Sequence, residues 1–172
     1  MIRPQQPWRV PVRVEDVPET GLHFDLVADE HVRSHLAAVA GVLSVPRLEA
    51  AIDVARHGNG LRATGRVTAT VEQTCVVTLE PMENQVDEPI DVIFASPSEG
   101  GFVDQDAPFE AEEPPEALSD GTADLGALAA EFLLLGIDPY PRMPGAEFTP
   151  PAEETAAAAP FAALARLKDA KK

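Results

Sequence analysis

One long alternation of apolar and polar residues, over residues 61–79, most constrains what this chain can fold into. Odd positions other than Gln73 are apolar or small, and even positions are mostly polar, among them Arg62 and Arg66. A strand with this pattern has a dry face and a wet face, which is typical of an antiparallel sheet with one solvated side. Because the run is too long for one straight strand, we expect a bulge or bend at Gly65 or Gln73.

Further alternating segments predict strands on both sides of this run. They cover residues 8–17, 22–26, 48–55 and 90–94. Pro11 places the first of them at a sheet edge or a bulge. The segment His57-Gly58-Asn59-Gly60 predicts a hairpin turn, since Asn and Gly tolerate positive φ. Residues 80–88 are expected to form a turn region before the last strand.

Two segments change to a helical period. Residues 28–43 predict a helix with Asp29 as N-cap, and its apolar stripe would be Val32, Leu36, Val39 and Leu43. Residues 124–135 predict a second helix that starts at Asp124 or Thr122 and ends at Gly136 and Pro139. Its apolar stripe would be Leu125, Leu128, Phe132 and Leu135. The fold class is therefore α+β: a curved antiparallel sheet with two helices packed on one face, forming a single domain over residues 8–141.

Two other segments lack a periodic pattern. Residues 96–121 combine prolines, glycines and acids, which predicts a flexible acidic insert within the domain. Residues 142–172 are expected to form an extended Pro/Ala-rich tail. A short terminal helix with Phe161, Leu164 and Leu167 would precede the last lysines.

The charge of the chain is strongly acidic and unevenly distributed. The formal net charge is −16, and no Lys or Arg occurs between Arg66 and Arg142. Such a field repels phosphate backbones and attracts basic proteins. The alternative is that the acidity only keeps the protein soluble.

The single cysteine, Cys75, excludes a disulfide within the chain and favours a reducing compartment. The N-terminus does not have the pattern of a signal peptide, and the longest apolar stretch is too short and interrupted for a membrane helix. A cytoplasmic protein with no membrane partner is the simplest interpretation.

Candidate chemical groups are few. His31 and His35 have the spacing of two metal ligands on a helix, but no further ligand completes a zinc site. Cys75 could be a nucleophile, yet its parity favours a buried structural thiol. No phosphate-binding glycine loop and no G-x-S-x-G segment occurs. We therefore assign no catalytic, metal or cofactor residue and expect no small-molecule substrate.

Three segments together resemble the YceD family of large ribosomal RNA subunit accumulation proteins, found in bacteria and plastids. They are residues 75–81 (CVVTLEP), residues 124–135 (DLGALAAEFLLL) running into 138–142 (DPYPR), and residues 160–168 (PFAALARLK). The resemblance implies a non-enzymatic role in making or accumulating large-subunit (23S) rRNA. Many members carry a second cysteine shortly after the first, whereas Val77 and Thr78 stand there in this chain, which favours a structural Cys75.

A partner of this ribosome-biogenesis factor would be a basic ribosomal protein or rRNA-processing factor, with rRNA contacted indirectly. The candidate partner-binding residues are Arg62, Arg66, Asp124, Glu131, Asp138, Tyr140 and Arg142. Two alternatives remain open. The chain could be an acidic protein-interaction module unrelated to ribosomes, or a metal-dependent rRNA hydrolase whose carboxylates hold Mg²⁺.

Overall fold

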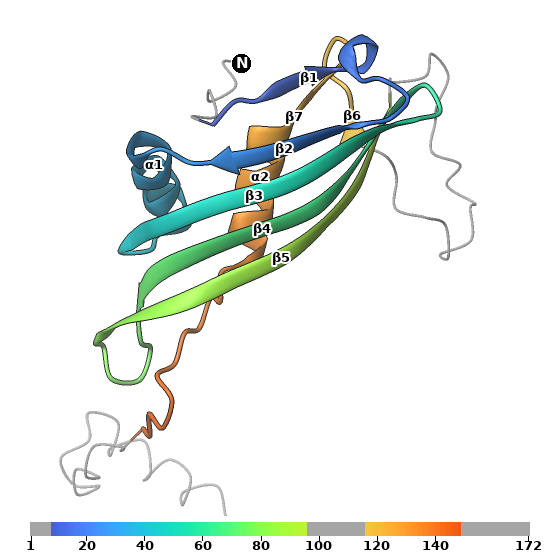
Figure 1. Ribbon diagram of the computed structural model, residues 1–172. Coiled ribbons are helices and arrows are strands. Elements are labelled where there is room, and N and C mark those ends of the chain that lie inside the picture. Colours follow the sequence, from blue (N-terminus) through green and yellow to red (C-terminus); the bar gives the residue numbers. More distant parts are fainter. Residues whose placement is uncertain (1–7, 96–115, 149–172) are drawn as a thin grey trace, which may run out of the picture.

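Four strands build most of a curved sheet, shown in Figure 1 for the computed structural model, which describes residues 8–95 and 116–148. They are β2 (Leu22–Val27), β3 (Ser44–His57), β4 (Gly60–Thr74) and β5 (Pro81–Ala95), and β6 (Glu116–Ala117) completes the order β2-β3-β4-β5-β6. The first three pairings are antiparallel, as predicted, but β5 and β6 are parallel. The sheet is therefore mixed rather than purely antiparallel, because β6 runs in the same direction as β5.

The hairpin predicted between the two central strands is confirmed. β3 ends at His57, β4 begins at Gly60, and Gly58 has a φ of 56°. The turn region predicted over residues 80–88 is wrong, because β5 already begins at Pro81 and the turn occupies residues 75–80. Glu83, Asp87 and Asp91 lie on the solvated face of this strand, where charge is as well tolerated as in a turn.

The predicted bulge in the long strand is also wrong. The register of β4 with β5 runs without a break from Leu61–Phe94 to Thr74–Pro81. An irregularity lies instead in β3, between Ser44 and Arg47. Gly65 allows the backbones of β3 and β4 to lie close together, because a Cβ at this position would lie 2.1 Å from the carbonyl oxygen of Ala51.

The strand predicted over residues 8–17 shrinks to β1 (Pro11–Arg13), which is followed by the 3₁₀ turn η1 (Val14–Asp16). β1 pairs with β7 (Thr122–Asp124) in a separate two-stranded sheet. The alternating residues are Val10, Val12 and Val14; Val12 is buried and pairs with Ala123 of β7, so the alternation does not reflect a place in the main sheet.

The first helix, α1 (Glu30–Ala40), starts as predicted, since the Asp29 carboxylate accepts a hydrogen bond from the Val32 N–H at 2.8 Å. Val32 and Leu36 are buried, whereas Val39 and Leu43 are 58% and 55% exposed. The predicted stripe is therefore correct only in its first half. The helix ends at Gly41 in the left-handed conformation, so Leu43 lies beyond it.

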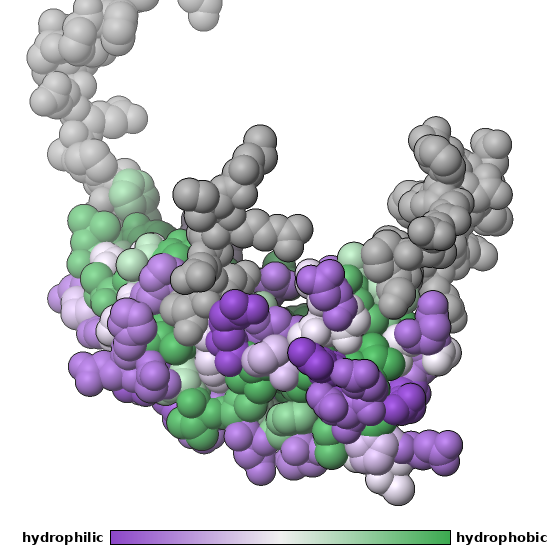
Figure 2. All heavy atoms as spheres, turned by 90° about the horizontal axis from the view of Figure 1, so that it is seen from above, coloured by the Kyte–Doolittle hydropathy of each residue, from purple (hydrophilic) through white to green (hydrophobic). Residues whose placement is uncertain are grey.

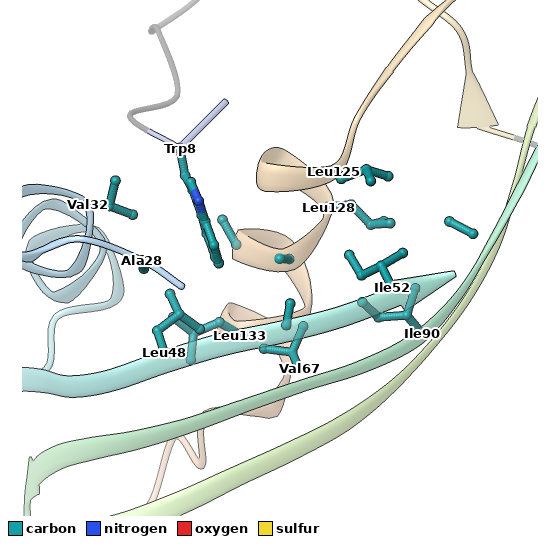
Figure 3. Packing of buried hydrophobic residues seen from close by; sticks show 14 of the residues in the cluster. Trp8, Ala28, Val32, Leu48, Ile52, Val67, Ile90, Leu125, Leu128 and Leu133 are labelled. Atoms are coloured by element: carbon teal, nitrogen blue, oxygen red, sulfur yellow. The ribbon is translucent and has the colours of Figure 1, made fainter. Parts of the chain in front are cut away.

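The second helix, α2 (Leu125–Gly136), has Asp124 as its N-cap. Leu125 and Leu128 are buried as predicted, but Leu133 is buried in place of Leu135, which is 77% exposed. Both helices lie on the dry face of the sheet, and Trp8 fills the space between them (Figure 3).

Residues 116–121, which the sequence assigned to the flexible insert, are part of the fold. Residues 116–121 carry β6 and the buried Leu118, whose N–H donates to the carbonyl oxygen of Ala95 at 2.9 Å. Residues 96–115 and the predicted tail beyond residue 148, with its short helix, lie outside the described residues. Seen from the end that carries β1, hydrophilic and hydrophobic residues are interspersed over the surface (Figure 2). Within the described ranges, no helix has the length and apolar character needed to cross a bilayer.

Candidate partner-binding surface at the β4–β5 turn

The turn over residues 75–80 holds one apolar residue in an unusual conformation. Leu79 has a φ of 61° and is 76% exposed. Two backbone bonds fix the turn: the Leu79 N–H donates to the carbonyl of Cys75, and the Cys75 N–H donates to the carbonyl of Glu80, both at 2.9 Å. A left-handed leucine costs free energy and its side chain recovers little by burial, so the strained, exposed residue marks this turn as a candidate functional feature.

The segment that follows α2 lies along this turn, at the end of the sheet opposite β1 (Figure 1). Gln73, buried on the dry face, donates from its side-chain nitrogen to the carbonyl of Asp138 at 2.8 Å. The Val76 N–H donates to the carbonyl of Pro141 at 2.9 Å. These bonds bring together two segments that are distant in the chain, since Gln73 and Asp138 are 65 residues apart.

Cys75 lies at the junction of the two segments and its side chain is fully buried. Its sulfur accepts hydrogen bonds from the N–H groups of Thr78, at 3.5 Å, and Met143, at 3.3 Å. Hydrogen bonds from the Thr78 hydroxyl, then from these two N–H groups, stabilise the thiolate and lower the pKa of Cys75 to about 7, against the opposing effect of burial. The structural thiol that the sequence predicted thus also organises the turn.

Six exposed residues of these two hydrogen-bonded segments make up a candidate binding surface, which we call the turn surface. It consists of Val76, Leu79, Glu80, Asp138, Tyr140 and Arg142. Leu79 and Tyr140 are more than 70% exposed. Aromatic residues and arginine are enriched in protein–protein interfaces, where an apolar centre is combined with a few polar groups. The turn surface can therefore bind a polypeptide, and within the described residues it includes no nucleophile with an adjacent base.

The family model described as "Large ribosomal RNA subunit accumulation protein YceD" matches residues 63–168. The chain belongs to the YceD family. The match includes both segments of the turn surface. Comparisons with curated proteins and with solved structures find no match.

Three of the residues predicted for partner binding come together in this YceD protein: Asp138, Tyr140 and Arg142 all lie on the turn surface. The side chain of Asp138 accepts a hydrogen bond from the Tyr140 N–H at 2.8 Å, which fixes the course of the segment. Sequence reasoning missed Val76, Leu79 and Glu80. These three residues lie in residues 75–81, one of the segments that resemble the YceD family, but the sequence alone does not show that they are exposed.

Arg62 and Arg66 lie elsewhere, on the solvated face of β4, and each meets a carboxylate of β5. The Arg62 guanidinium binds both oxygens of Asp91, at 2.8 and 2.7 Å, and lowers the pKa of that carboxyl. Arg66 forms an ion pair with Asp87. Both arginines are thus engaged within the sheet.

Asp124 caps the start of α2 and Glu131 lies within this helix, and the two acids differ in their surroundings. Asp124 accepts hydrogen bonds from the N–H groups of Val10, at 2.9 Å, and Ala127, at 3.3 Å, so its carboxylate holds the N-terminal segment against the helix. Glu131 is exposed, and partial burial together with the nearby Glu116 raises its pKa. In the described parts of the chain, no three His, Cys, Asp or Glu side chains are grouped to hold a metal ion.

Proposed function

We propose that this YceD protein acts in large-subunit rRNA accumulation as a non-enzymatic, cytoplasmic binding factor, and that its direct partner is a basic ribosomal or rRNA-processing protein. The family description supports the link to large-subunit rRNA. The choice of a protein partner rests on the charges of this chain.

The observation that carries the proposal is the pairing of Arg62 and Arg66 with Asp91 and Asp87. A protein gains affinity for a phosphate backbone when its cations replace condensed counterions. Here each arginine would have to leave a carboxylate of its own sheet to do so. Arg47 is likewise held by Glu49, and His23 lies between Asp53 and Asp25.

The net charge of the chain favours a basic partner. The net charge of −16 steers a cationic protein toward the chain, and the association rate of such a pair falls as salt screens the field. The turn surface supplies what electrostatic attraction alone does not: exposed apolar groups at Leu79 and Tyr140 that can be buried on binding.

The proposal is tested by titrating the full chain with basic ribosomal proteins and, separately, with large-subunit rRNA fragments across a salt series. We expect binding to a ribosomal protein that Leu79→Ser with Tyr140→Ser weakens and that Arg62→Ala with Arg66→Ala leaves nearly unchanged. Arg13→Ala with Glu15→Ala, which removes an exposed ion pair elsewhere, is the matched control. Tight rRNA binding without a protein partner, lost in the Arg62/Arg66 variant, would show that the factor binds RNA itself.

A further inference from the structure

The outer edge of β5 is largely unpaired. β6 pairs only with Phe94 and Ala95, at one end of a strand that begins at Pro81. Along residues 81–93, no strand among the described residues lies against this edge, and β5 is the outermost long strand in Figure 1. An unpaired edge is a template on which another extended chain can add a strand.

The register shows which backbone groups point out from this edge. The Cys75 N–H donates to the carbonyl of Glu80, so these two residues form a hydrogen-bonded pair. Hydrogen-bonded pairs recur at every second residue of an antiparallel ladder, and the β4–β5 register has no break, so the even residues of β5 bond to β4. The odd residues therefore point their N–H and C=O groups away from the sheet. The bond from the Leu118 N–H to the carbonyl of Ala95 agrees with this assignment.

Pro89 occupies one of the outward positions and has no N–H to offer. It divides the edge, and the longer stretch with intact donors is residues 83–87, where Glu83, Gln85 and Asp87 present outward N–H groups. A proline in an edge strand is a common means of limiting indiscriminate pairing. The available edge is thus short and lies next to the β4–β5 turn.

The charges at this stretch select the chain that can add to it. Glu83 lies directly opposite Glu72 in the register, although like charges in this relation are destabilising. Glu72 accepts a hydrogen bond from the Ser44 hydroxyl at 2.9 Å, and no ion pair with either glutamate is found among the described residues. A cation placed beside this pair would relieve the repulsion.

We propose that the outward edge of residues 83–87 in β5 binds an extended basic segment of a partner polypeptide by adding it as a further strand. The identity of the partner as a basic protein rests on the proposed function. The backbone groups of Glu83, Gln85 and Asp87 supply the ladder bonds, and Glu72 with Glu83 supplies the preference for lysine or arginine.

Other occupants fit this edge less well. A second copy pairing edge to edge would bring Glu83 and Asp87 against the same acids of its partner. Residues 96–115 carry six acids and no Lys or Arg. The basic C-terminal residues 166–172 are the remaining competitor within the chain, and removing them distinguishes them from a partner.

The probe is a fluorescein-labelled synthetic peptide of alternating lysine and threonine, titrated into the full chain by fluorescence anisotropy. Gln85→Pro removes one outward N–H without changing the charge, and Gln85→Thr removes the same side chain while keeping the N–H. We expect Gln85→Pro to weaken binding about tenfold relative to Gln85→Thr, because the proline removes one hydrogen bond of the ladder and disturbs the geometry of the next one. The same peptide with N-methylated backbone amides has the same charge and should bind far more weakly.

Charge and location are tested in the same assay. Glu72→Gln with Glu83→Gln should weaken peptide binding and flatten its salt dependence, and the peptide should slow hydrogen exchange at the N–H groups of Gln85 and Asp87. Equal binding of the natural and N-methylated peptides, or of the two Gln85 variants, would overturn the strand-addition proposal. Tighter peptide binding after removal of residues 166–172 would show that these residues compete for the edge in the same chain.

The outcomes separate this inference from the proposed function. If a basic ribosomal protein binds wild type and Gln85→Pro equally well, the edge is not the binding site, although the protein-binding role stands. If the peptide binds as expected but no ribosomal protein does, the edge binds basic strands and the proposed partner class is wrong.

Discussion

The backbone N–H of Met143 donates a hydrogen bond to the sulfur of Cys75, with 3.3 Å between nitrogen and sulfur, although the two residues are 68 positions apart. The bond closes the segment after α2 onto the β4–β5 turn. The turn surface therefore depends on one buried sulfur atom that accepts bonds from both of its sides.

We expect the thiol of Cys75 to titrate near pH 7 in the native protein, because three donors stabilise its thiolate. The ultraviolet absorbance of the thiolate measures this directly, and the unfolded chain should titrate near the ordinary value of 9.0. Despite its low pKa, the native thiol should react slowly with labelling reagents, since it is fully buried. Rapid native labelling would contradict the structural role.

Thr78→Val should raise the pKa of Cys75, because the Thr78 hydroxyl is the largest cause of its depression.

The depressed native pKa of Cys75 also predicts how stability varies with pH. Since the thiolate is favoured in the folded state, the free energy of unfolding should rise from about pH 7 toward pH 9 and fall as pH decreases through 7. Chemical denaturation over this range, compared with Cys75→Ala, isolates the contribution.

Leu79→Asn should stabilise the fold slightly and weaken partner binding. Asparagine tolerates the left-handed conformation that leucine occupies with strain, so we expect a gain of about 0.5–1 kcal/mol in the free energy of unfolding. Because the Leu79 side chain is mostly exposed, little burial is lost. Denaturation and the ribosomal-protein titration measure the two effects, and a variant that is both less stable and fully competent in binding would count against the functional role of Leu79.

Asp124→Ala should be more harmful than Asp29→Ala, although both residues cap helices. Asp29 binds one N–H of its helix, and its loss should cost about 1 kcal/mol. Asp124 also binds the Val10 N–H of the N-terminal segment, so its loss should cost about 2–3 kcal/mol. Equal costs in urea denaturation would show that the contact with Val10 contributes nothing.

Gly65→Ala should destabilise the sheet by about 1–3 kcal/mol, because the new Cβ would collide with the carbonyl oxygen of Ala51 and the strands would have to shift. Gly58→Ala is the comparison: its Cβ meets open space, so only the strain of its positive φ, about 1 kcal/mol, applies. Thermal unfolding of both variants gives the difference.

The period of the sequence predicted the central elements well. The alternation over residues 61–75 and the Asn-Gly turn give β4 and its hairpin because one buried face leaves a strand little freedom of register. The errors have a common cause: the period of a sequence indicates which residues are buried, but it does not show which element they pack against. Val10, Val12 and Val14 alternate like a strand of the main sheet, although Val12 pairs with Ala123 in the small second sheet. Leu135 continues the apolar stripe of α2, although its side chain is exposed.

The candidate site was only partly accessible from the sequence. Asp138, Tyr140 and Arg142 were identified as a segment, but nothing in one sequence shows that this segment joins the turn at Cys75 through backbone bonds. The pairing of Arg62 with Asp91 depends on the register between β4 and β5, which follows from the length of the turn. The strain at Leu79 likewise becomes visible only when the turn is seen to bond Leu79 back to Cys75.

The pairing of β1 with β7 has a consequence for the order in which this protein is completed during synthesis. Residues 22–95 form antiparallel pairs of strands that follow one another in the chain, and these pairs can close as soon as they leave the translating ribosome, since their contacts are local. Trp8 and β1 are made before these strands, yet they must wait for Thr122–Asp124 and the start of α2 before their own partners exist. This segment is thus made before the main sheet and locks into place after it. A chain cut before residue 122 would lack α2 and β7, and of the two described helices only α1 would cover the dry face of its sheet.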